Sequence, residues 1–433
     1  MYDHVIVGGG PGGMTLATLL PGKNILIEKE TTLGGCHRVT RVDGYFTEHG
    51  PRIYGTSYIN TIAILKTIGI EWDDYFTDYN FSFLSIGSQE IVSQLKWNEI
   101  ASLVIEFINF SFGGTNKTIS VGEWIKDFSE ETKNLIDRIC RMTDGADSSR
   151  YLLTSFLEIF NQNFFYKFQQ PKNAMDKGLI RDWESKLNCE IIKNEKVISL
   201  KPYSVITSSH REIKGKKIIF AMPPQYTADL LMDYNPFNYD LGEYAKETKY
   251  SNYISLTFHF KNKQNVDLVW GLAKDSLWGL VFIRLSDYMK NEGELFTIAV
   301  TKIDAVGLSG KIASECSELE IKKEVFDQMN KIFRFKDQPI KIIYKGNDQA
   351  FVITKAGYND MQGRDGFYTC STHLGKSHYA FTSFESAVTN AIWLVNQLYN
   401  KNIQILKLWT VDYLVVQSIF IILIFAILFS IKR

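Results

Sequence analysis

The chain of 433 residues has few cysteines, few prolines and no excess charge of either sign. Its five cysteines are scattered, without the paired spacing of a zinc site or the density of a disulfide framework. Lysine plus arginine equals aspartate plus glutamate, so there is no basic field for nucleic acid. We therefore expect no metal site, no nucleic-acid partner and a reducing compartment. The composition does not show which oligomeric state the protein adopts.

The first twenty residues combine a strand pattern with a cluster of glycines. The stretch "DHVIVGGGPGGMTLATLL" carries Gly8, Gly10 and Gly13. In a strand–turn–helix unit, the first glycine permits the turn, the second admits a pyrophosphate, and the third lets the helix approach the strand. The next apolar segment ends in Glu28, whose carboxylate can accept hydrogen bonds from ribose hydroxyls. The pattern predicts a dinucleotide-binding unit.

A second glycine pair, Gly34 and Gly35, follows Glu28 by six residues. With this pair the sequence resembles the flavoprotein superfamily of amine oxidases, protoporphyrinogen oxidases, carotenoid desaturases and UDP-galactopyranose mutases. The resemblance implies that the cofactor is FAD rather than NAD. In that superfamily an arginine near the pyrophosphate usually follows the pair, whereas Cys36 stands there in this chain. Arg38 lies two residues further on, on the same face of an extended segment, and could supply the guanidinium. Ordinary surface polarity is the alternative for Arg38.

The segment "EHGPRIYG", residues 48–55, resembles the family segment whose backbone passes the isoalloxazine ring. Gly50 and Pro51 match that segment. Arg52 stands where the mutases have a histidine. The resemblance implies that these three residues contact the cofactor. A simple Gly-Pro turn without a ligand is the alternative.

The resemblance extends to the second half of the chain. Val197 matches a family valine near the adenine, and Glu385 matches a position on the helix that caps the flavin. Amine oxidases have a lysine at the start of the strand that corresponds to "NYISLTFHF". In this chain the matching position falls on either Asn252 or Tyr253. The alternatives are a core valine and a docking helix without cofactor contact. The missing lysine argues against a literal amine oxidase.

The C-terminal region contains a long hydrophobic run. Residues 413–431 include no charged residue and are followed only by Lys432 and Arg433. A helix of this length spans about 28 Å, close to the thickness of the hydrocarbon core of a bilayer. The run predicts a single-pass tail anchor in a lipid bilayer, with the catalytic domain in the cytosol. A buried core helix is the alternative.

The predicted fold class is α/β, with a Rossmann-type FAD-binding domain, an interleaved α+β substrate domain and the C-terminal transmembrane helix. The predicted parts, in chain order, are FAD-binding at 1–55, substrate (mostly helical) at 56–172, FAD-binding at 173–235, substrate (sheet-rich) at 236–360, FAD-binding at 361–400, a linker at 401–412 and the anchor at 413–431.

The predicted function is an FAD-dependent oxidoreductase resembling the amine oxidases. It would take a hydride from an amine or from a CH–CH pair of a small-molecule substrate. Because the cofactor supplies this chemistry, no side-chain nucleophile is required, and the sequence identifies no catalytic residue.

Two alternative functions remain open. One is a UDP-galactopyranose-mutase-like flavoenzyme, with Arg284 as a candidate for holding a diphosphate. The other is a non-catalytic, membrane-anchored flavoprotein, suggested by the altered motifs.

Overall fold

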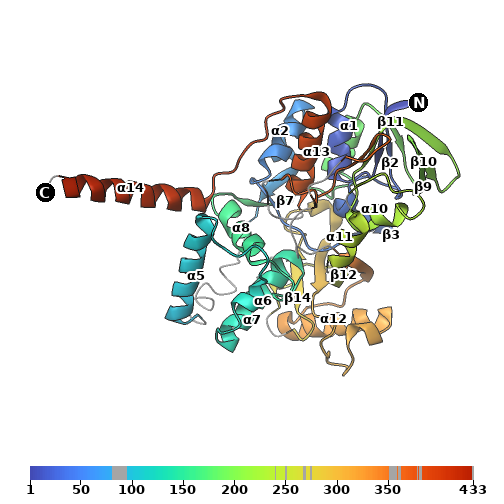
Figure 1. Ribbon diagram of the computed structural model, residues 1–433. Helices are drawn as coiled ribbons and strands as arrows, with labels where there is room; N and C mark the ends of the chain where they lie inside the picture. Colours follow the sequence, from blue (N-terminus) through green and yellow to red (C-terminus); the bar gives the residue numbers. More distant parts are fainter. Residues whose placement is uncertain are drawn as a thin grey trace.

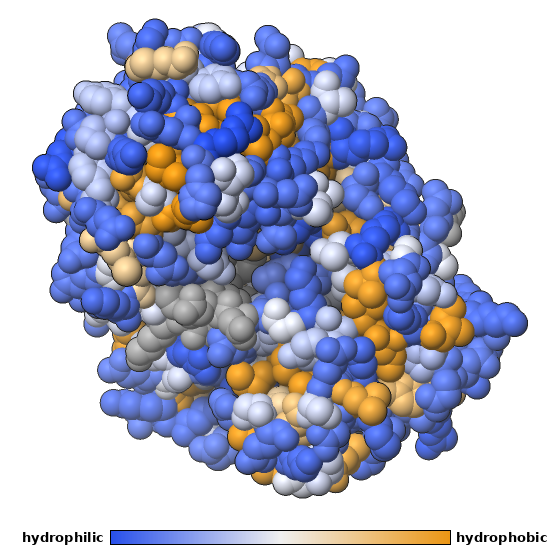
Figure 2. Space-filling view, turned by 90° about the vertical axis from the view of Figure 1, so that its right-hand side faces the viewer, coloured by the Kyte–Doolittle hydropathy of each residue, from blue (hydrophilic) through white to orange (hydrophobic). Residues whose placement is uncertain are grey.

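The computed structural model describes most of the chain, namely residues 1–79, 95–238, 240–248, 251–266, 270–273, 276–350, 358, 362–377, 379 and 383–431. Figure 1 shows a large sheet flanked by helices at the upper right, a second sheet below it and a group of helices at the lower left. Figure 2 shows that one face of the molecule is hollowed between its upper and lower parts.

The large sheet is centred on three parallel strands, β1 (Tyr2–Val7), β2 (Asn24–Ile27) and β11 (Glu212–Phe220). Strand β1 lies in the middle, where Val7 pairs with Ile27 on one side and with Phe220 on the other. The short strand β17 (Phe367–Thr369) also pairs in parallel with β11. The carboxyl ends of β1 and β2 therefore meet at one edge, which is where open α/β sheets bind ligands.

The sheet continues on both sides of this centre. On one side β8 (Glu190–Ile192) pairs in parallel with β2. On the other side β10 (Ser204–Thr207) and β9 (Val197–Lys201) add antiparallel strands next to β11. Helix α9 (Leu179–Ser185) precedes β8 in the chain.

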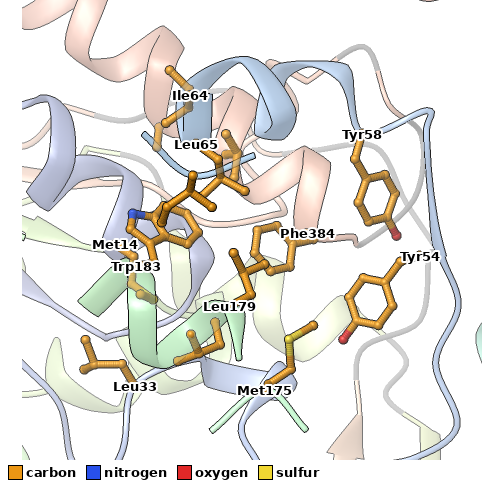
Figure 3. Packing of buried hydrophobic residues seen from close by; sticks show 14 of the residues in the cluster. Met14, Leu33, Tyr54, Tyr58, Ile64, Leu65, Met175, Leu179, Trp183 and Phe384 are labelled. Carbon is orange, nitrogen blue, oxygen red and sulfur yellow. The ribbon is translucent and has the colours of Figure 1, made fainter. Parts of the chain in front are cut away.

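Helices bury both faces of β1 and β2, which explains why these strands are apolar at consecutive positions. On one face, Ile6 and Leu26 lie in a core with α1 (Pro11–Leu19) and α13 (Phe384–Tyr399). Figure 3 shows part of that core, where Trp183 of α9 stacks on Phe384 with ring centroids 6.0 Å apart. The other face packs against α10 and α11, residues 224–230 and 241–247.

The second sheet is antiparallel, and its two faces differ. Its strands, in spatial order, are β13 (Trp270–Leu272), β14 (Leu280–Arg284), β15 (Glu294–Val300), β12 (Ser251–Phe260) and β16 (Lys341–Ala350). Leu256 and Phe258 of β12 belong to the core beneath α12 (Glu318–Phe333). The alternate residue Thr257 faces the opposite way and lies 3.0 Å from the Thr47 hydroxyl. In the hairpin of β3 (Thr40–Val42) and β4 (Tyr45–Thr47), Phe46 and Thr47 of β4 are buried, and Thr47 meets this polar face of the sheet.

A third group of elements lies between β4 and α9 in the sequence. Helices α2 (Ile59–Thr67), α3 (Trp72–Tyr75), α5 (Trp97–Ser111), α6 (Val121–Trp124), α7 (Glu130–Asp144) and α8 (Leu153–Asn163) are accompanied by a small sheet of β5 (Tyr54–Gly55), β7 (Phe168–Pro171) and β6 (Phe76–Asp78).

The last helix, α14 (Val411–Ile431), corrects the prediction for the C-terminal region. It projects from the body at the left of Figure 1. Its first turn is tied to α8, because the Asp412 amide donates a hydrogen bond to Asn161 Oδ1 at 2.8 Å. Among the residues that the structure describes, no helix is long and apolar enough to cross a bilayer.

The predicted tail anchor, the bilayer as a partner and the single-pass membrane localisation are therefore wrong. The prediction used the hydropathy of residues 413–431 alone.

Helix α2 is fixed to α13 by one buried carboxylate, that of Glu385. It accepts hydrogen bonds from the amide and side chain of Asn60 and from the amide and hydroxyl of Thr61, at 2.7 to 2.9 Å. These donors belong to the first turn of α2, where amides have no partner within the helix. Glu385 therefore caps α2 from a different helix.

We predict that Glu385→Ala lowers the free energy of unfolding by at least about 3 kcal/mol, because four buried donors lose their acceptor. Urea denaturation followed by circular dichroism measures this change. Glu130→Ala is the matched control, since Glu130 lies in the first turn of α7 with an exposed side chain, and its cost should stay below about 0.5 kcal/mol. Equal effects of the two substitutions would contradict the assigned role of Glu385.

Candidate functional site

The glycines that follow β1 allow three backbone segments to meet. Gly8 has a φ of +109°, and a Cβ there would lie 2.6 Å from the Ala221 carbonyl oxygen. A Cβ on Gly13 would lie 1.9 Å from the Gly8 carbonyl oxygen. Helix α1 therefore approaches the end of β1 as closely as the sequence predicts. Gly10 is more open, because the nearest atom to a Cβ there is Gly35 Cα at 3.7 Å.

The second glycine pair packs directly on the first turn. The Gly34 amide donates a hydrogen bond to the Gly9 carbonyl at 2.8 Å. Gly34 and Gly35 have φ values of +111° and +55°, and a Cβ on Gly35 would lie 2.9 Å from Gly10 Cα. Two turns without side chains thus lie backbone to backbone at the carboxyl ends of β1 and β2. This arrangement exposes amides to a ligand without obstruction by side chains.

Glu28 directly follows β2 and points at the first turn. Its carboxylate accepts hydrogen bonds from the Gly9 amide at 2.7 Å and from the Glu30 amide at 3.0 Å. A carboxylate offers about four acceptor positions, so two remain for the hydroxyls of a ligand. Val197 lies near this acid in space, because it follows Glu195 by two residues and the Glu195 amide donates to the Glu28 carbonyl at 3.1 Å. The structure therefore brings both predicted residues to the same edge of the sheet.

Two other predicted residues are already engaged by protein groups. Arg38 Nη2 lies 3.4 Å from Glu30 Oε1, beside the second glycine pair. Glu385 has all four of its hydrogen bonds with α2, as described above. Burial raises the pKa of Glu385, although those four hydrogen bonds oppose the shift. The carboxylate therefore has a structural partner in α2, and the neighbouring Phe384 is the residue that touches His37, with ring centroids 4.8 Å apart.

The segment that contains Gly50 and Pro51 is covered by the polar face of the second sheet. A Cβ on Gly50 would lie 3.1 Å from Cε2 of Tyr253. The Tyr253 hydroxyl and the Asn347 side-chain amide both donate to the His49 carbonyl, at 3.3 and 2.9 Å. Of the two residues that match the family lysine, Tyr253 is therefore the one that contacts this segment.

Arg52 and Glu48 form the electrostatic centre of the same segment. Nε of Arg52 is buried and has no hydrogen-bond partner among the described residues. Burial raises the pKa of Glu48 to about 7, and the nearby charge of Arg52 opposes this shift. A carboxyl group with such a pKa can hold or release a proton near neutral pH.

The pKa values of basic residues around this centre are lowered rather than raised. Burial, followed by the charge of Arg52, holds the pKa values of His37 and His49 well below their usual range. Burial also lowers the pKa of Lys345 on β16, with further contributions from Arg38 and Arg52. The two histidines are therefore neutral near pH 7. His37 Nδ1 lies 3.0 Å from the hydroxyl of Tyr54, whose place beside Phe384 is visible in Figure 3.

Sequence reasoning did not single out Glu48, His49 and Lys345 as members of this site, and it named Tyr253 only as a residue at the position of the missing lysine. The available signal was the alternation of β12, whose residues facing the site are Tyr253, Ser255 and Thr257 rather than apolar ones. A buried strand with one polar face indicates that this face meets something polar. The sequence could not show that the face meets residues 47–52.

Comparison with known proteins agrees with this fold. A family model described as an NAD(P)-binding Rossmann-like domain matches residues 6–68. No curated protein matches the chain.

Many solved structures match across most of the chain. A putrescine oxidase bound to putrescine has a TM-score of 0.69 and 12% identity, covering 92% of this chain and 99% of its own. Cyclohexylamine oxidase from Brevibacterium oxydans has a TM-score of 0.62 and 13% identity, with shares of 92% and 99%. An oxidoreductase from Methanosarcina mazei has a TM-score of 0.65 and 13% identity, with shares of 91% and 99%. At such identities the likeness shows the fold alone, and the chain shares that fold with putrescine oxidase and cyclohexylamine oxidase.

The raised pKa of Glu48 predicts a pH-dependent stability. As pH rises from the ordinary glutamate pKa through about 7, ionisation of the buried carboxyl group destabilises the folded state. In Glu48→Gln the side chain cannot ionise. The free energy of unfolding of this variant, measured relative to wild type, should therefore increase by up to about 3 kcal/mol from pH 4 to pH 8. Urea denaturation at intervals of one pH unit measures the difference.

The control for this prediction is Glu71→Gln, because Glu71 is exposed at the start of α3. Its pH profile should run parallel to that of wild type. A parallel profile for Glu48→Gln as well would show that Glu48 is not a buried acid with a raised pKa.

Proposed function

We propose that this protein is an FAD-dependent oxidoreductase that resembles the amine oxidases and acts on a small-molecule substrate. The observation that carries the proposal is the stacking of the two glycine turns beside Glu28. This cradle offers backbone amides for a pyrophosphate and a buried carboxylate for ribose hydroxyls. The fold shared with putrescine oxidase and cyclohexylamine oxidase supports it.

The residues of the cradle suit the parts of FAD in order along the edge of the sheet. The first turn of α1, from Gly10 to Gly13, would hold the pyrophosphate, because free amides and the helix dipole favour negative charge there. Glu28 would accept hydrogen bonds from the ribose, and Val197 would lie near the adenine. Gly34, Gly35 and Arg38 would contact the phosphates from the other side. When bound, FAD supplies the acceptor for a hydride equivalent.

The segment from Gly50 to Arg52 would lie along the reactive part of the cofactor. Tyr253 and Asn347 hold this segment through the His49 carbonyl. The second sheet thereby covers the site and limits the access of water. Arg52 supplies a buried positive charge, which stabilises any negative charge that develops beside it. Glu48 is the nearby group that can hold a proton near neutral pH.

One observation argues against the mutase alternative. Arg284, the candidate for holding a diphosphate, is buried in an ion pair with Glu294 at 2.9 Å. Its Nη1 also donates to the Val266 carbonyl at 3.0 Å. This guanidinium is therefore occupied within the second sheet. The oxidoreductase proposal does not depend on it.

We also propose the predicted division of the chain into FAD-binding and substrate parts. Strands β1, β2, β8 to β11 and β17 lie in one sheet, and they come from residues 1–55, 173–235 and 361–400. The second sheet lies within residues 236–360. This arrangement supports the proposed boundaries.

The cradle predicts a sharp difference between two adjacent glycine substitutions. Gly13→Ala would place its Cβ 1.9 Å from the Gly8 carbonyl oxygen, whereas Gly12→Ala would meet Ala387 at an ordinary 3.4 Å. We expect the wild type and Gly12→Ala to purify with bound flavin, and Gly13→Ala to lose it. The flavin content of each purified protein is measured from its absorbance in the visible bands of flavin. A colourless wild type that binds no added FAD would refute the cofactor.

The reaction itself is tested by anaerobic titration of the flavin-containing protein with candidate amines. Bleaching of the flavin absorbance by an amine, followed by recovery on admission of oxygen, is the expected result. Flavin that no amine and no CH–CH substrate bleaches would favour a non-catalytic flavoprotein. Activity that requires reduced flavin without consumption of oxygen would favour the mutase alternative.

A further inference from the structure

The polar face of the second sheet contains a row of side chains directed at the segment that includes Arg52. In β12 this face carries Tyr253, Ser255 and Thr257, and the last of these reaches Thr47. Directly opposite Ser255 on β16 is Lys345. Paired residues on antiparallel strands point to the same side, with Cβ atoms about 5 Å apart. Lys345 and Ser255 therefore face the Arg52 segment together.

Buried donors in this region lack a hydrogen-bond partner among the described residues. They include Nε of Arg52 and the hydroxyl of Ser255, and Ser255 is 0% exposed. A buried donor without an acceptor is costly, so such groups usually mark the place of a bound molecule or water. An acceptor that reaches both donors would remove this cost.

The charges of the region specify what kind of acceptor fits. Arg38, Arg52 and Lys345 are basic, and the charges of the two arginines act on Lys345. Two acids lie nearby. Glu30 is paired with Arg38, and Glu48 carries the raised pKa described above. Positive charge is therefore in excess, and it is greatest around Arg52 and Lys345.

We propose that Arg52, Ser255 and Lys345 bind a carboxylate group of the substrate. This inference rests on the proposed function and specifies its substrate class, namely an amine or CH–CH compound that carries an acid group. A guanidinium, an ammonium group and a hydroxyl can together satisfy the oxygens of a carboxylate. A substrate with two positive charges, such as the putrescine bound by one structural neighbour, would be repelled here.

Binding of benzoate and of benzamide to the flavin-containing protein tests the proposal. The two probes have the same shape, but only benzoate is charged. Perturbation of the flavin spectrum gives the two dissociation constants, and thermal shift provides a readout that needs no flavin. We expect benzoate to bind at least about ten-fold more tightly than benzamide. Equal binding of the two probes would overturn the proposal.

The variants are chosen to separate binding from folding. Lys345→Met keeps the length of the side chain, and Ser255→Ala removes only a hydroxyl. Lys341→Met is the matched control, since Lys341 lies on the same face of β16 but pairs with Asp43 at 2.7 Å, an exposed residue. Lys345→Met should weaken benzoate binding about ten-fold or more, Ser255→Ala should weaken it less, and Lys341→Met should leave it unchanged.

The same donors could serve a reduced, anionic flavin instead of a substrate, and the midpoint potential of the flavin distinguishes the two. If Lys345→Met lowers the potential while benzoate binds as in wild type, the anion is the flavin and the proposal is wrong. If the protein holds no flavin, the proposed function fails. Stabilisation by benzoate that Lys345→Met abolishes would then still support a carboxylate site, and no stabilisation would overturn it.

Discussion

The site depends on a backbone hydrogen bond from the Gly34 amide to the Gly9 carbonyl. It joins the turn after β1 to the turn after β2, and both turns depend on the absence of side chains. A Cβ on Gly13 or Gly35 would penetrate the neighbouring backbone. Because this contact lies at the carboxyl ends of two parallel strands, it places Glu28 and the first turn of α1 around one ligand site.

The second sheet completes the site from the opposite side. Its α12 face is apolar, as expected of a strand layer beneath a helix, but its other face carries hydroxyl, amide and ammonium groups. Tyr253 and Asn347 use that face to hold the His49 carbonyl. The same contact brings Arg52 and Glu48 beneath the sheet, where burial shifts the pKa of the acid upward. The local electrostatics thus arise from the junction of two layers that are distant in sequence.

Glu385 has a structural role that the sequence match did not indicate. The resemblance implies that this residue belongs to the helix that caps the flavin, and it does lie in the first turn of α13. Its carboxylate nevertheless caps α2, because the amides of Asn60 and Thr61 have no other acceptor within that helix.

Hydropathy alone was insufficient to predict the role of residues 413–431. The composition of the run predicts a membrane span, whereas the described part of the structure contains no helix that qualifies.

The sequence by itself determined the strand, turn and helix of the first thirty residues, the second glycine pair and the position of Glu28, because these features depend on local backbone geometry. Only the tertiary structure decided that Ser255 pairs with Lys345 across two strands, that burial raises the pKa of Glu48 and that Glu385 caps α2. Those properties depend on burial and on partners up to 325 residues away in the sequence. Local patterns carry no information about such partners, since the same polar residues occur equally on exposed surfaces.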